Sequence, residues 1–156
     1  MVRMTKYKTR LTENKRVELE KDVSKNCPGL TYVIKSPDDA ATIGREFLRI
    51  HEESEEYMHM ICLNTKNKVI GVFEISHGNV NSSIVGTREV FQKALLANAV
   101  SIILLHNHPS GDCTPSREDI EVTKRLVEAG KLIGIEVLDH LVMGDRYCSL
   151  KEKGYL

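Results

Sequence analysis

Residues 101–119, SIILLHNHPSGDCTPSRED, are the part of the sequence that decides the fold. Residues 101–105 form a compact apolar run without alternation, which is typical of a strand covered on both faces. Residues 109–112 have the composition of a tight turn. A helix is expected from about 116 to 129, because Ser116 and Asp119 have the spacing of a capping box. The order strand, turn, helix indicates an α/β type of protein.

The rest of the chain continues this alternation of helical and strand patterns. In chain order, we expect a helix over 36–51, strands over 57–63 and 69–76, a short strand around Ile84 and Val85, a helix beginning near Thr87, and strands over 133–143 and 147–150. The predicted fold class is therefore α/β or α+β, with a mixed central β-sheet flanked by helices. The turn at 26–29, Asn-Cys-Pro-Gly, divides the chain into a basic N-terminal extension (1–29) and one domain (30–156).

Composition places few limits on function. With 156 residues, 41% of them hydrophobic and 28% charged, the sequence resembles that of a soluble globular domain. No apolar run approaches the roughly 20 residues of a membrane span, and no hydrophobic segment follows the charged start. The four cysteines form no CxxC pair, so we expect reduced thiols in a cytoplasmic protein without membrane contact. The oligomeric state stays open.

Charge is unevenly distributed although the net charge is zero. Residues 1–26 hold eight Lys and Arg against four acidic residues, a net charge of +4. We expect this segment to be solvated and partly disordered or helical. Such a basic arm can also bind nucleic acid, but it lacks the interleaved aromatic residues of a single-strand binding surface.

Three side chains in the central stretch have the chemistry of a metal site. His106 and His108 are two residues apart in an extended segment, so their imidazoles point to the same side. They lie at the carboxyl end of a buried strand, where α/β sheets bind their ligands. Asp119, in the first turn of the next helix, can face back toward them. Two histidines and a carboxylate leave tetrahedral Zn²⁺ one open position, as in catalytic zinc sites. Cys113 is a weaker alternative ligand.

These residues carry a resemblance to a known family. His-x-His, seven residues, Ser, two residues, Asp resembles the JAMM signature of the MPN(+) metallopeptidases. HNHPSGDCTPSRED with the following IEVTKRLVEAGKLIGIEVLDHLVMGD is similar to the C-terminal domain of bacterial RadC proteins, over about 36–156. The resemblance implies a cytidine-deaminase-like JAB/MPN sandwich that hydrolyses peptide or isopeptide bonds. It implies that His106, His108 and Asp119 bind zinc and that Ser116 stabilises the oxyanion.

The same resemblance implies a catalytic glutamate at the start of the first hairpin strand. Counting back from residues 62–64 gives Glu56, with Glu55 as the alternative. A carboxylate at the mouth of a strand can act as general base on a water molecule. The acidic run over 52–56 is also what a solvated loop would show.

Two classes of function follow. The first is a zinc metallopeptidase acting on a peptide or protein substrate. The second is a non-catalytic or DNA-repair-associated accessory module that binds DNA or a protein partner. Asp139 and His140 are expected on a strand near the site, either with the Asp139 carboxylate behind the ligands or as a buried, hydrogen-bonded pair. His51, His59 and His77 are expected to be structural or at the surface.

Overall fold

The computed structural model describes residues 1–79 and 85–156. Within them, the strands form one mixed sheet in the order β2-β1-β4-β3-β5-β6-β7. The strands are β1 (Val2–Leu11), β2 (Val17–Cys27), β3 (Tyr57–Leu63), β4 (Val69–His77), β5 (Ser101–Asn107), β6 (Glu136–Met143) and β7 (Tyr147–Ser149). The helices are α1 (Pro37–Thr42), which continues into the π-helical η1 (Ile43–Phe47), the 3₁₀ turn η2 (Ile50–Glu52), α2 (Thr87–Leu96) and α3 (Arg117–Ile133).

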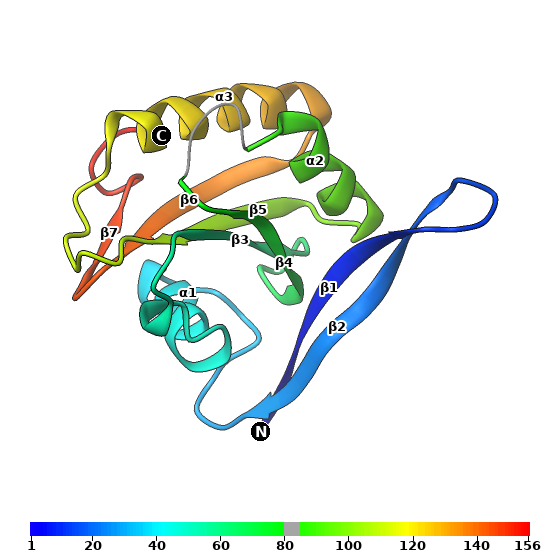
Figure 1. Cartoon of the computed structure of the whole chain (residues 1–156), viewed down its shortest axis with the longest axis horizontal. Coiled ribbons are helices and arrows are strands. Elements are labelled where there is room, and N and C mark those ends of the chain that lie inside the picture. The colour runs from blue at the N-terminus through cyan, green and yellow to red at the C-terminus, as the bar shows by residue number, and fades with distance from the viewer. Residues whose placement is uncertain (80–84) are drawn as a thin grey trace.

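The sheet is covered on both faces. Figure 1 shows α2 and α3 on one face and α1 on the other. Strand β5 is buried along its whole length, and its side chains alternate between the two layers. Ile103 and Leu105 pack with α1, whereas Ile102 and Leu104 pack with α2 and α3. The predicted mixed sheet flanked by helices, and the doubly covered central strand, are confirmed.

The connection from β5 to β6 determines where polar side chains collect. The two strands are parallel, and α3 forms the crossover between them. Their carboxyl ends therefore lie at the same edge, where Asn107 pairs with Met143. Strand β3 runs antiparallel to β5, so the start of β3 lies at this edge too. In α/β sheets, ligands bind at such an edge.

The expectation for the basic N-terminal segment is wrong. Residues 2–27 form an antiparallel hairpin, β1 with β2, instead of a disordered or helical extension. Strand β1 also joins the sheet, pairing parallel with β4 at Lys6 and Tyr7. Two ion pairs across the hairpin neutralise part of its positive charge: Lys6 with Asp22 at 3.0 Å and Arg10 with Glu20 at 3.6 Å. The net charge of a segment does not determine its secondary structure, so charge counting missed these two strands.

Element boundaries differ by a few residues from the predicted ones. Helix α3 runs on to Ile133 and ends at Gly134, whose φ of 85° is the left-handed conformation common after a helix. Strand β6 consequently begins at Glu136. Of the short strand expected around Ile84 and Val85, Ile84 lies outside the described residues, and Val85 belongs to no strand. In the described part of the chain, no helix combines the length and apolar composition of a membrane span.

The prediction for the cysteines is half wrong. Cys113 and Cys148 form a disulfide across 35 residues of sequence, with their Cα atoms 5.6 Å apart. Cys27 and Cys62 are free thiols and are buried. The pairing depends on the loop after β5 folding against β7, which sequence spacing does not reveal.

Candidate metal centre

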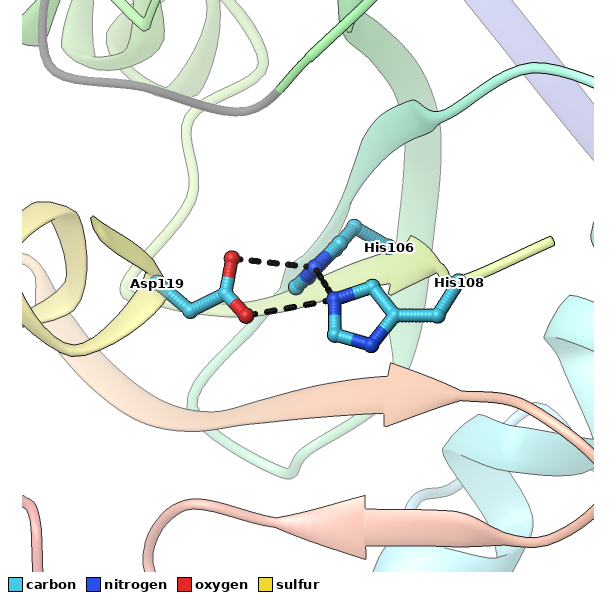
Figure 2. A group of neighbouring side chains, drawn as sticks. All are labelled: His106, His108 and Asp119. Carbon is cyan, nitrogen blue, oxygen red and sulfur yellow. Dashed lines mark hydrogen bonds and ion pairs between the residues drawn. The ribbon is translucent and has the colours of Figure 1, made fainter. Parts of the chain in front are cut away.

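His106, His108 and Asp119 converge at the carboxyl end of β5. One ligand atom from each lies within 4.8 Å of the others. The Nε2 atoms of the two histidines are 3.0 Å apart. Asp119 Oδ1 is 3.1 Å from His106 Nε2, and Asp119 Oδ2 is 3.3 Å from His108 Nε2. Figure 2 shows the carboxylate facing both imidazoles. These three groups could hold a metal ion.

The turn after β5 sets the position of His108. The His108 amide donates to the carbonyl of Met143 at 2.8 Å, and the Gly111 amide donates to the carbonyl of His108 at 3.0 Å. The turn lies directly on Gly144, where an added Cβ would be 2.2 Å from the Gly111 carbonyl oxygen. Gly144 therefore allows the close approach of two backbone segments that holds His108 beside His106.

Asp119 combines a capping role with its place in the metal group. Its Oδ2 accepts the Ser116 amide at 2.7 Å, and its own amide donates to Ser116 Oγ at 3.1 Å. This reciprocal capping box fixes the first turn of α3. It also fixes the Asp119 carboxylate in direction, so capping and metal binding are compatible.

The carboxylate of Asp119 is buried and ionised. Burial acts to raise its pKa, but hydrogen bonds with His106 and His108 outweigh this and hold the pKa well below its usual range. Asp119 in turn raises the pKa of His108. A buried negative charge beside two imidazole nitrogens is an environment that favours a divalent cation.

Behind His106 lies a second layer of buried polar side chains. His106 Nδ1 is 2.8 Å from Nε2 of His140 on β6, and His140 Nδ1 is 2.6 Å from Thr123 Oγ1 on α3. Thr123 Oγ1 donates to the carbonyl of Asp119 at 2.6 Å. Burial lowers the pKa of His140 well below its ordinary value, so the ring is neutral.

Asp139 is a buried, hydrogen-bonded residue and does not lie behind the ligands as a carboxylate partner. Of this pair, His140 contacts His106. Asp139 accepts hydrogen bonds from the Ser149 hydroxyl at 2.6 Å and from the Lys151 amide at 3.1 Å, so it ties β6 to the segment after β7.

The metal group opens onto a cleft of about 520 Å³. Its lining includes Glu56, His108, Ser116 and Asp119. Glu55 does not line this cleft. Its carboxylate contacts the His77 imidazole at the exposed surface. The structure thus brings together the predicted ligands, Ser116 and Glu56, and places Glu55 elsewhere.

Asn107 is a residue of this site that sequence reasoning missed. Its side chain is buried, accepts the Tyr57 amide at 2.7 Å and donates to the Glu55 carbonyl at 2.9 Å. These bonds hold the backbone on both sides of Glu56. An amide between two candidate ligands was the available signal, because a buried Asn needs partners for both its donors and its acceptor.

The remaining candidates do not join the group. The Cys113 sulfur is bonded to Cys148, so it is not a ligand here. His59 is buried within the sheet, and the side chains of His51 and His77 are about half exposed. These three histidines are structural or at the surface, as predicted.

Fold and site together define an α+β domain with a triad of side chains that could hold a metal ion. Residues 34–155 match the family described as the RadC-like JAB domain. The chain therefore belongs to the RadC-like JAB domain family.

Several bacterial relatives are more than half identical to this chain over the aligned residues. A UPF0758 protein of Geobacillus sp. (strain WCH70) is 53% identical over 141 residues, which cover 90% of this chain and 62% of that protein. A UPF0758 protein of Caldanaerobacter subterraneus is 52% identical over 140 residues, covering 89% of this chain and 59% of that protein. A UPF0758 protein of Bacillus velezensis is 54% identical over 141 residues, covering 90% of this chain and 60% of that protein. The chain thus spans about three fifths of the length of these relatives.

Proposed function

We propose that the protein is a zinc-dependent hydrolase of peptide or isopeptide bonds. The observation that supports it best is the convergence of His106, His108 and Asp119 on one point in the wall of a cleft that Glu56 and Ser116 also line. Membership of the RadC-like JAB domain family supports the same chemistry through the resemblance of its motif to that of metallopeptidases.

The donor set fits zinc. Two imidazole nitrogens and one carboxylate oxygen form the kind of three-residue set that catalytic zinc sites use, with a fourth position left open. Zinc bound there would polarise a substrate carbonyl and lower the pKa of a bound water to about 7.

Glu56 is the proposed general base and acid. Its position on the cleft beside His108 allows it to take a proton from the attacking water and pass it to the leaving amine. Asn107 keeps the backbone around Glu56 in place.

Ser116 is the proposed oxyanion donor. Its Oγ accepts the Asp119 amide, and this bond does not use the hydroxyl hydrogen. That hydrogen can donate to the oxygen that becomes negative when the carbonyl is attacked.

The test is activity on a library of fluorogenic peptides and of lysine Nε-linked isopeptides, for the wild type, Glu56→Gln and Glu55→Gln. We expect Glu56→Gln to lose about 10²- to 10⁴-fold in kcat, the usual contribution of a general base, with its zinc content unchanged. Glu55→Gln is the matched control and should stay near wild-type activity. A fully active Glu56→Gln would overturn the proposed role, and activity lost only in Glu55→Gln would move it to Glu55.

A further inference from the structure

We propose that Thr123 and His140 form a directional hydrogen-bond relay that holds His106 in one tautomer, with its proton on Nδ1 and its Nε2 open to the metal. The inference rests on the proposed metal site. It assigns positioning roles to two residues that touch neither the metal position nor the cleft.

The relay joins three elements through buried atoms. It runs from His106 on β5 to His140 on β6 at 2.8 Å, then to Thr123 on α3 at 2.6 Å, and ends at the Asp119 carbonyl at 2.6 Å. The three side chains are fully buried. Water therefore has no access that would let these groups exchange partners freely.

Counting protons gives each bond its direction. The Thr123 hydroxyl has one hydrogen, which it donates to the Asp119 carbonyl, so its oxygen must accept from His140 Nδ1–H. A neutral imidazole has one N–H, so His140 Nε2 is then an acceptor. It accepts from His106 Nδ1–H. With a metal bound, the lone pair of His106 Nε2 would then point at the metal, in place of the contact between this nitrogen and Asp119.

The two histidine ligands are oriented by different means. Nδ1 of His108 faces a backbone group, the Asp112 carbonyl at 2.8 Å in an exposed turn. The ring of His106 is held by side chains. Since the relay ends on the backbone of Asp119, it also ties the β5 ligand to the α3 ligand.

Thr123→Val is the variant that separates this role from simple packing. It keeps the shape of the side chain and removes the hydroxyl, whereas Thr123→Ser, the matched control, keeps the hydroxyl. Without a hydrogen-bond acceptor at position 123, the His140 tautomer with its proton on Nδ1 is no longer stabilised. A proton on His140 Nε2 would face His106 Nδ1 and push the His106 proton onto the metal-binding nitrogen.

The experiment measures zinc affinity by competition with a chelator and reads protonation of the zinc-loaded protein by long-range ¹H–¹⁵N NMR of the histidine rings. We expect Thr123→Val to bind zinc about 10- to 100-fold more weakly, the usual effect of removing an outer partner of a metal-bound histidine. Thr123→Ser should stay within about threefold of the wild type, since its hydroxyl keeps the same bonds. The wild-type spectrum should show His140 protonated on Nδ1 only. His140→Phe, which removes the acceptor of the His106 proton, should weaken zinc binding as much as Thr123→Val.

Each result has one meaning. A proton on His140 Nε2, or wild-type zinc affinity in Thr123→Val, overturns the relay while leaving the metal site intact. A wild-type protein that takes up no zinc overturns the proposed function and the relay with it. Should His140→Phe fail to fold, Thr123→Val and the wild-type spectrum still decide the question.

Discussion

Single side chains in this site serve two purposes at once. The Asp119 carboxylate accepts a hydrogen bond from the Ser116 amide, which caps α3. The same carboxylate contacts two imidazoles. Ser116 accepts the Asp119 amide and lines the cleft. In the sequence, residues 116–119 have the pattern of an ordinary helix start. The hydrogen bonds of this helix start also fix the direction of the Asp119 carboxylate.

Asp119→Asn separates charge from capping. The amide oxygen can still accept the Ser116 amide, so the helix start should survive, but the negative charge is lost. We expect the fold to be retained, as measured by circular dichroism, and zinc uptake to fall to background. Zinc uptake equal to that of the wild type would show that Asp119 is not a ligand.

Asn107→Ala should lower activity without removing the metal. Its side chain holds the backbone on both sides of Glu56, and an error of about 1 Å in the position of a catalytic group can cost about 100-fold in rate. We expect kcat to fall at least tenfold, with zinc content unchanged. Asn64→Ala is the matched control, because the Asn64 side chain also makes two hydrogen bonds with the backbone, accepting from the amides of Lys66 and Lys68 in the turn at the other end of β3. Equal activities of the two variants would contradict the role of Asn107.

At the scale of elements, β5, the following turn and the start of α3 form one unit, and the sequence predicts it well. The apolar run of β5, the turn residues and the capping box are local signals, so they are readable without the fold. The contacts between that unit and other segments of the chain cannot be predicted from such local signals. The contacts of Asn107 with residues 55 and 57, of His106 with His140 and of Cys113 with Cys148 join segments 34 to 52 residues apart. They depend on the order of strands in the sheet.

Gly144→Ala should disturb the turn that positions His108. Its Cβ would lie 2.2 Å from the Gly111 carbonyl oxygen, so the turn must move. We expect a loss of about 1–3 kcal/mol in the free energy of unfolding, as for other overpacked sites, together with weaker zinc binding. Gly134→Ala is the control: its φ of 85° is strained for alanine, but nothing lies within 4 Å of the added Cβ. It should lose stability and keep zinc affinity. Unchanged zinc affinity in Gly144→Ala would show that this contact does not set His108.

At the scale of the whole molecule, the N-terminal hairpin is an edge of the main sheet. Figure 1 shows its β1–β2 tip extending away from the helical layers. Its charge was readable from the sequence, but its structure was not, because a strand at the edge of a sheet depends on the strand it joins. Met4 of β1 is buried in the core on the α1 side of the sheet, together with Val72 of β4.

Met4→Ala should therefore destabilise the whole domain. Removing a buried methionine side chain costs about 2–5 kcal/mol in the free energy of unfolding. Leu11 lies in the same strand and is 56% exposed. Leu11→Ala is therefore the control and should change the free energy of unfolding by less than about 0.5 kcal/mol. Chemical denaturation of both variants gives the comparison. Similar stability of Met4→Ala and the wild type would show that the hairpin is not part of the core.

The most direct test of the account is the metal content of the whole chain, measured by mass spectrometry on the wild type and on the His106→Ala, His108→Ala double variant. The geometry predicts about one zinc per chain in the wild type, as a three-residue site with one open position would hold, and none in the double variant. Wild-type protein that neither carries zinc as purified nor takes it up from solution would contradict the proposed hydrolase.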